Sequence, residues 1–523
     1  MTPWQRMLTL GLVAFVTTSL VAGKGLRAQS SDSLALARRA HELTTRLDLD
    51  FAKRELEGAD PDLADVVVAK GRLGIYTGDC DEAAALLGRR ELAADEDARA
   101  LADVARGCAR VTAALVVRKD EARAIEVKFQ DEHDVALFPL LVETIEKART
   151  MLSADLGVDW PKPTRFVVVR DHLSLSAMTG LPYESARTTG TVAVAKWGKV
   201  TLLSPRAAHH GYAWRDTVTH ELTHLAITRA SADRAPLWLQ EGLAKREEVR
   251  WRAPSAFDDR PSPEAVVLRG IEKKLDLPLD KLGPSIAMLP SAEAAMVAFS
   301  EVTSFVRYFA DRSEKDALPR LLGALKNGQT VDDALKTVSG KDLPAWDVEW
   351  RAYLAKRPKE PLSAAYGLGA PPKNLREARE KIRLAELLLA NGHSAEALRE
   401  MSTVTDELLA DPSVRALRGR ALEAQNRREE VFPLVADPKD VIASHAPWWA
   451  LRGRALSGRG DLSGANAAFV EGLGEDPFNA EVGCRTTSSE VSSTVGGADA
   501  GGGSTDPGLC AAAKRNASAY AAD

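Results

Sequence analysis

The chain has 523 residues, of which 45% are hydrophobic and 27% charged, with a formal net charge of −5. That length favours about three domains, since roughly 150 residues per domain is a reasonable prior. The composition is that of a soluble globular protein, and the slightly acidic balance excludes the electrostatic signature of a nucleic-acid-binding protein.

A targeting segment is predicted at the start of the chain. Arg6 supplies a positive charge, residues 7–22 form a nearly continuous apolar run, and small residues follow, with Leu26-Arg27-Ala28 as the best cleavage site. These are the parts of a secretory signal peptide over residues 1–28, and the apolar run is shorter than the ~20 residues of a membrane-spanning helix. We therefore expect a periplasmic or secreted bacterial protein. It contacts the membrane only if the segment stays uncleaved as an anchor, the alternative suggested by basic residues near the cleavage site.

Residues 29–112 are predicted to form a domain of antiparallel helices. Gly71, Gly78, Ala83 and Leu87 follow the small-then-large spacing of a tetratricopeptide-like helix pair. The pattern indicates a helical hairpin domain.

Helical periodicity gives way to extended segments after this domain. The predicted elements are strands at residues 114–117, 124–129 and 166–169, an amphipathic helix at 135–156, and a hairpin at 191–203. The hairpin turn is expected at Lys196-Trp197-Gly198-Lys199. Together these elements predict a small sheet ahead of the next helix.

That helix carries the motif His220-Glu221-Leu222-Thr223-His224. Histidines four residues apart lie on one face of a helix, so both imidazoles can bind one metal ion. Glu221 could hold a metal-activated water and accept its proton. A third ligand is offered by Glu241, which follows a connection ending at Pro236. The alternative is that both histidines are ordinary packed helix residues.

The motif and the segment Pro236-Leu237-Trp238-Leu239-Gln240-Glu241-Gly242-Leu243-Ala244 resemble the gluzincin metallopeptidases, and among them the peptidase MA-like family. The resemblance implies zinc held by His220, His224 and Glu241, with Glu221 as general base. It also implies an α+β, mainly helical zincin-like domain with a small mixed sheet over residues 113–357.

In that family an edge strand lies along the cleft and pairs with extended substrate backbone. Such pairing supplies main-chain hydrogen bonds that tolerate many sequences. The resemblance assigns this role to residues 191–195 or, as the alternative, to residues 200–203.

Two positions depart from the family pattern. Phe299 replaces a tyrosine that could face the metal, and Lys245 replaces a carboxylate that orients a zinc-binding histidine. Partners of the latter kind affect metal affinity. Glu247 or Glu248 could take over the orienting role, and the candidate donors that could replace the tyrosine are Tyr212, His209, His210 and Tyr308.

An internal repeat follows a predicted linker at residues 358–376. The segment Leu417-Arg418-Gly419-Arg420-Ala421-Leu422 recurs 34 residues later, starting at Leu451. This is the tetratricopeptide period, so residues 377–483 are predicted to form about three α-helical repeats whose concave surface binds a protein partner. The alternative is that these repeats only extend the scaffold.

Four cysteines fall into two local pairs, Cys80 with Cys108 and Cys484 with Cys510. Three connectivities are open to four cysteines, and local pairing is the natural one. In an exported protein we expect structural disulfides, the alternative being free buried thiols. The second pair would close a Ser/Gly-rich tail at residues 484–523.

Two functions are open at this stage. The first is an exported zinc metallopeptidase that hydrolyses peptide or protein substrates by zinc-activated water, with Glu221 as general base. The second is a catalytically impaired gluzincin domain that serves as a repeat-based scaffold for protein binding. Phe299 and Lys245 are the residues that favour the second function.

Overall fold

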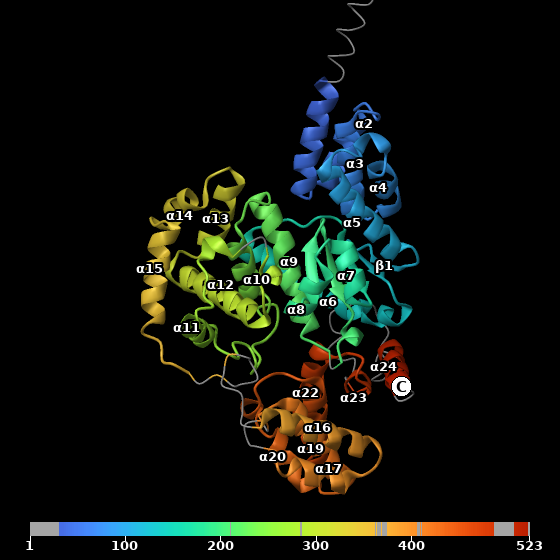
Figure 1. The fold of residues 1–523 in the computed structure, drawn as a ribbon, viewed down its shortest axis with the longest axis vertical. Coiled ribbons are helices and arrows are strands. Elements are labelled where there is room, and N and C mark those ends of the chain that lie inside the picture. The colour runs from blue at the N-terminus through green and yellow to red at the C-terminus, as the bar shows by residue number, and fades with distance from the viewer. Residues whose placement is uncertain are drawn as a thin grey trace, which may run out of the picture. The chain divides into compact units, whose positions relative to one another are not determined.

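The computed structural model describes residues 31–209, 211–282, 285–360, 374–404, 410–485 and 507–520, together with residues 362, 368 and 408 (Figure 1). The predicted signal peptide and much of the predicted linker and tail lie outside these residues. The chain divides into two compact units, one of residues 1–114 with 177–180 and one of residues 115–176 with 181–523. No helix among the described residues combines the length and the apolar character needed to cross a membrane.

The first unit consists of helices that pack through small residues. Its elements are a helix over residues 31–45, α2 (Leu49–Glu57), α3 (Ala64–Thr77), α4 (Cys80–Leu87), η1 (Arg90–Leu92) and α5 (Glu96–Thr112). A Cβ placed on Gly71 would lie 2.5 Å from the Leu87 side chain, so the glycine allows α3 and α4 to approach closely. A disulfide between Cys80 and Cys108 joins α4 to α5, as predicted.

The second unit contains a mixed sheet of five strands. They are β1 (Val116–Asp120), β2 (Ile125–Phe129), β3 (Thr164–Val169), β4 (Ala193–Lys196) and β5 (Lys199–Leu203), in the order β1-β2-β3-β5-β4. The central strands β2, β3 and β5 run parallel, and the two edge strands pair antiparallel to them. Every residue of β5 is buried, as expected for a strand covered on both faces. The α+β, mainly helical fold with a small mixed sheet is confirmed.

The strand order corrects one prediction. Because β5 lies between β3 and β4, residues 200–203 cannot pair with an extended substrate, and the alternative that placed an edge strand there is wrong. Within this hairpin the edge strand is β4. Its hairpin with β5 turns at Trp197 and Gly198, whose φ angles of 55° and 68° match the turn that joins twisted strands most readily.

The predicted elements at 114–117 and 135–156 differ slightly in the structure. The first strand begins two residues later, at Val116. The helix begins with the 3₁₀ turn η2 (Glu132–Leu137), and α6 (Phe138–Leu156) follows. Pro139 accounts for this start, since it lacks the amide proton that an interior helical position would donate.

Helices cover the sheet and continue beyond it. They are α7 (His172–Thr179), α8 (Tyr183–Thr189), η3 (Pro205–Ala207), α9 (Trp214–Ser231), α10 (Leu237–Glu247), α11 (Pro263–Lys273), η4 (Leu279–Lys281), η5 (Ile286–Met288), α12 (Ala292–Arg312), α13 (Ala317–Lys326), α14 (Val331–Ser339) and α15 (Leu343–Leu354). Helix α9 packs against α6, α10 and the β4–β5 hairpin, and α10 packs against α12. The Phe305 ring lies edge-on between Trp238 and Trp350, so buried aromatic contacts connect α10, α12 and α15.

The predicted repeat region is built from helical hairpins. Its elements are α16 (Leu375–Ala390), α17 (Ser394–Met401), α19 (Pro412–Ala424), η7 (Arg428–Glu430), α20 (Phe432–Val435), η8 (Pro438–Asp440), α21 (Ala446–Gly458), α22 (Leu462–Glu475), α23 (Ala480–Gly483) and α24 (Pro507–Tyr520). Gly453 of α21 lies against Phe469 of α22, where a Cβ would come within 2.5 Å of the ring. The assignment to tetratricopeptide repeats stays a prediction.

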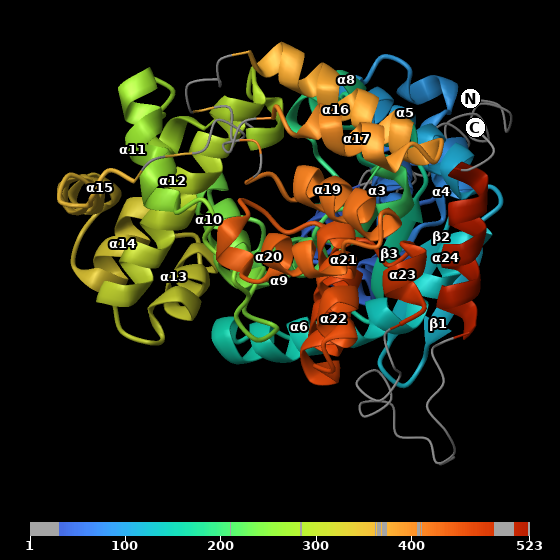
Figure 2. The same ribbon diagram turned by 90° about the horizontal axis from the view of Figure 1, so that it is seen from below.

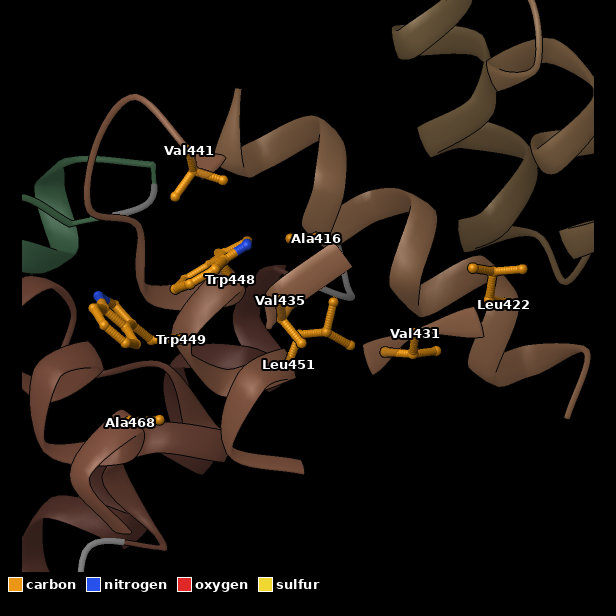
Figure 3. Packing of buried hydrophobic residues seen from close by; sticks show 9 residues of the cluster. All are labelled: Ala416, Leu422, Val431, Val435, Val441, Trp448, Trp449, Leu451 and Ala468. Atoms are coloured by element: carbon orange, nitrogen blue, oxygen red, sulfur yellow. The ribbon is translucent and has the colours of Figure 1, made fainter. Parts of the chain in front are cut away.

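The middle hairpin is irregular, and prolines explain why. Where a second long helix is expected after α19, the chain forms η7, the four-residue α20 and η8. Pro433 and Pro438 cannot donate the backbone hydrogen bonds of a helix interior. Val431, Val435 and Val441 of this segment still pack with Trp448 and Trp449 in one buried cluster (Figure 3).

The C-terminal helix is tied to the repeat region. α24 lies beside α23 (Figure 2), and the disulfide between Cys484 and Cys510 joins them. This pairing was predicted, and the described residues contain no free cysteine.

A buried carboxyl on α12 makes the stability of the fold depend on pH. Glu301 is fully buried, its Oε1 has no hydrogen-bond partner in the described part of the chain, and its Oε2 accepts a bond from the Leu277 amide. Burial raises the pKa of Glu301 to about 8. The neutral acid therefore stabilises the fold below the ordinary pKa of a glutamate, and this contribution is lost as the pH rises through about 8.

We predict that Glu301→Gln hardly changes the free energy of unfolding at pH 5 and raises it by about 2 kcal/mol at pH 9. Urea unfolding at both pH values measures the difference. The exposed Glu386→Gln on α16 is the control and should show no such pH dependence. An equal effect of Glu301→Gln at both pH values would contradict the prediction.

Candidate metal centre

Helix α9 presents the two histidines of the motif on one face. His220 and His224 are separated by one turn, and their ring centroids are 5.0 Å apart. The helix ends at Ser231. Ala232 and Asp233 then adopt positive φ angles of 53° and 61°, which reverse the chain.

Helix α10 returns along α9 and brings Glu241 to the histidines. Pro236 precedes its first residue, a position at which extended backbone is required. Gly242 allows the close approach of α10 to α12, because a Cβ there would lie 2.6 Å from the Val302 carbonyl oxygen and would overlap the Val306 side chain. The glycine beside Glu241 is therefore needed for the close packing of α10 against α12.

The three predicted ligands converge. The Nε2 atoms of His220 and His224 are 3.3 Å apart, and each lies 3.5 Å from Oε2 of Glu241. Ligand atoms bound tetrahedrally at the zinc–nitrogen and zinc–oxygen distances of about 2.0–2.2 Å are about 3.3–3.5 Å from one another. The donor set and its spacing therefore fit a zinc ion.

Acidic groups outnumber the imidazoles around this position. Burial opposes charge on His220, but hydrogen bonds to Glu241 and Glu248 outweigh it and raise the pKa of His220 to about 10. The pKa of Glu241 lies far below its usual range, because the two histidines outweigh the effect of burial. The arrangement of charges therefore favours a cation at this position, such as a metal ion.

The carboxyl group of Glu221 is buried and held by the sheet. Its Oε2 accepts a hydrogen bond from the backbone amide of Ala195 on β4. Burial raises the pKa of Glu221 above its ordinary value, although both histidines act against that shift. No sequence pattern indicates this contact, since Ala195 lies 26 residues upstream on an element of another type.

Glu248 takes the orienting role that Lys245 cannot fill. Its Oε2 lies 3.0 Å from Nδ1 of His220, and its Oε1 accepts a hydrogen bond of 2.7 Å from the Lys245 ammonium. Glu247, the other candidate, pairs instead with Arg246 and Arg250. Lys245 thus acts on the histidine through Glu248.

Phe299 faces the centre without offering a donor. Its ring lies 6.5 Å from the His220 ring, centroid to centroid, and the Lys245 nitrogen is 5.8 Å from the Phe299 centroid. Two of the candidate replacements are engaged elsewhere. Tyr212 donates its hydroxyl proton to the Leu203 carbonyl, and Tyr308 packs against Trp346 and Tyr353. His209 is exposed, and His210 lies outside the described residues.

We predict that Gly242→Ala separates α10 from α12 and weakens metal binding. Overpacking costs typically about 1–3 kcal/mol, more than the gain of up to ~1 kcal/mol from the helix propensity of alanine. Urea unfolding and zinc competition with a chelator measure both effects. The matched control is Gly323→Ala on α13, where a Cβ meets nothing within 4 Å. Equal behaviour of the two variants would contradict this account.

A second prediction concerns Glu248. Glu248→Ala should lower zinc affinity by roughly 10–100-fold, the usual effect of losing a group that orients a ligating histidine. Glu272→Ala on α11 is the control, because this glutamate pairs with Arg269 and Lys359 away from the metal centre. It should leave the zinc affinity unchanged. Unchanged affinity in Glu248→Ala would show that the imidazole does not need this carboxylate.

Comparison with known proteins agrees with this geometry. A family model described as the Peptidase MA superfamily matches residues 144–356, which include all four residues of the centre. No curated protein matches the chain. The match supports a peptidase MA-like domain, and with it a metallopeptidase-like function, over residues 144–356 of this protein.

Proposed function

We propose that the protein is an exported zinc-dependent metallopeptidase. The observation that carries the proposal is the convergence of His220, His224 and Glu241 at the spacing of tetrahedral ligands. The buried carboxyl of Glu221 on the same helix supplies the base, and the superfamily match supplies the reaction class. Peptide or protein chains are the proposed substrates.

The residues of the centre have separate roles in the proposed reaction. His220, His224 and Glu241 would hold the zinc ion, which would make water more acidic and polarise a peptide carbonyl. Glu221 accepts a proton from the attacking water and can then deliver it to the departing amine. Its hydrogen bond from Ala195 fixes the carboxylate in place during these transfers. Glu248 keeps the His220 ring in a single orientation.

The edge strand β4 is proposed to align the substrate. One side of β4 pairs with β5, and the Ala195 amide on the other side reaches Glu221. A substrate backbone added along this free edge would therefore run past the general base. Main-chain pairing of this kind accepts many sequences.

Export is supported by the two disulfides. Cys80–Cys108 and Cys484–Cys510 lie in different parts of the chain, and each joins two helices. Disulfides persist in oxidising compartments and are rare in a reducing cytosol. We therefore propose a periplasmic or secreted location.

Phe299 favours a second candidate function. No hydroxyl group is present at the ring that faces His220, so an oxyanion formed there would lack one stabilising donor. A domain that holds zinc but hydrolyses peptides poorly could serve as a scaffold, with the predicted repeats binding a partner.

The zinc and base assignments predict a clear set of results. Purified mature protein should contain about one zinc per chain by elemental analysis, and replacing both histidines with alanine should abolish it.

Glu221→Gln should keep zinc and fold, because the glutamine oxygen can still accept the Ala195 hydrogen bond. Hydrolysis of a broad peptide library should fall roughly 10²–10⁴-fold. Zinc retained by the double histidine variant would refute the ligand assignment.

The same assay separates the two candidates through Phe299→Tyr. A single oxyanion donor is worth about 10²–10³-fold in rate, so a restored hydroxyl should increase hydrolysis if its absence limits turnover. The scaffold function predicts that the original protein, Phe299→Tyr and Glu221→Gln are equally inert despite bound zinc.

A further inference from the structure

A cleft of about 950 Å³ lies between residues that contact His220 and the last helical hairpin of the predicted repeat region. On one side it is lined by Lys245, Glu248 and Phe299, the residues next to His220. On the other side it is lined by α22, including Glu471 and Glu475. The repeat region therefore contributes directly to the space beside the proposed catalytic centre.

Specific contacts hold α22 in this position. The Trp214 indole at the start of α9 donates a 3.0 Å hydrogen bond to the Leu473 carbonyl, and the Tyr212 amide donates a 2.9 Å bond to the Glu475 carbonyl. Trp214 is fully buried. The helix that carries His220 is thus bonded at its first residue to the helix that lines the cleft.

Aromatic packing adds a second attachment. The Phe257 ring, which lines the cleft, packs edge-on against Trp448 and Trp449 of α21 at centroid distances of 6.5 and 5.7 Å. Arg260 donates to the backbone carbonyls of Pro438 and Val441. These contacts make the repeat helices a fixed side of the cleft.

Most of the basic side chains that line the cleft already have acidic partners. Arg252 binds both Asp216, at 2.6 Å, and Asp258, at 2.8 Å. The remaining lysines and arginines of the lining, apart from Arg260, pair as follows: Lys147 and Arg215 with Glu143, Lys245 with Glu248, and Arg307 with Asp259.

Two glutamates of α22 that line the cleft differ from the acidic residues named above. Among the residues that the structure describes, Glu471 and Glu475 have no lysine or arginine within ion-pair distance. Glu471 accepts a 3.3 Å hydrogen bond from the Ser255 hydroxyl, and Glu475 is hydrogen-bonded by Ser444. Burial raises the pKa of both groups, that of Glu475 to about 7, and the nearby Asp216 adds to the rise, whereas the charge of Arg252 acts against it.

We propose that α22 forms one side of the substrate cleft and that Glu471 and Glu475 select a peptide carrying a lysine or arginine side chain. The inference rests on the proposed function for the identity of the substrate as a peptide. A cationic side chain would supply the partner that the two carboxylates lack, and charge-assisted hydrogen bonds of this kind are among the stronger ones in proteins.

The test measures binding separately from cleavage. Ten-residue peptides of glycine, serine and alanine, blocked at both ends, carry one lysine at each position in turn. Matched peptides carry norleucine, which has the same length without the charge. Fluorescence anisotropy with zinc-loaded, full-length Glu221→Gln protein gives the affinities. Cleavage of the same peptides is then measured with the zinc-loaded, full-length protein in which Glu221 is intact.

We expect the best lysine peptide to bind about tenfold more tightly than its norleucine partner, since a hydrogen bond to a charged group contributes at this level. Adding Glu471→Gln and Glu475→Gln should reduce the ratio to within about twofold. Adding Glu429→Gln instead, at an exposed glutamate outside the cleft, should leave it unchanged. Thermal unfolding checks that each variant folds.

The inference is overturned if lysine and norleucine peptides bind equally, or if the preference survives in the Glu471→Gln/Glu475→Gln variant. A lysine preference in binding without any cleavage would support the cleft and refute the peptidase function. Cleavage without a lysine preference would support the peptidase function and refute the role of α22 in selecting the substrate.

Discussion

The imidazole of His220 is held at both ring nitrogens, and this double attachment is the constraint on which the site depends. Nε2 faces Glu241 at 3.5 Å and Nδ1 faces Glu248 at 3.0 Å. Both carboxylates come from α10 or its C-terminal end, so the position of this helix determines the orientation of a side chain on α9. The contact of α10 with α12 at Gly242 in turn sets how closely Glu241 can approach.

The sheet contributes to the same site through one backbone group. The Ala195 amide of β4 binds the Glu221 carboxylate, which links the proposed general base to the strand proposed to align the substrate. A carboxylate that is buried and fixed is costly to the fold, because burial disfavours its charge. The imidazoles beside it reduce that cost, although the charge of Glu241 increases it.

The departures at Lys245 and Phe299 affect the site differently. Lys245 binds Glu248, so the position that lost a carboxylate now supports the glutamate three residues later. Phe299 occupies its place beside His220 without a substitute hydroxyl from Tyr212 or Tyr308, which are engaged by Leu203 and by neighbouring aromatic rings. The three ligand side chains therefore fit a metal ion, and Phe299 bears on how efficient the proposed hydrolysis is.

Local sequence determined those features that depend on neighbours along the chain. The four-residue spacing of His220 and His224 places both on one helical face, and Trp197-Gly198 suits the tight turn of the hairpin. Both disulfides join cysteines that are fewer than thirty residues apart. Tertiary structure alone decided that β5 lies inside the sheet, that Glu248 and not Glu247 reaches His220, and that α22 lines the cleft. Those outcomes depend on the order of strands, the rotation of one helix end and the packing of segments more than 200 residues apart, such as Trp214 and Leu473. No periodicity along the chain encodes them, because each is decided by which distant surfaces bury one another.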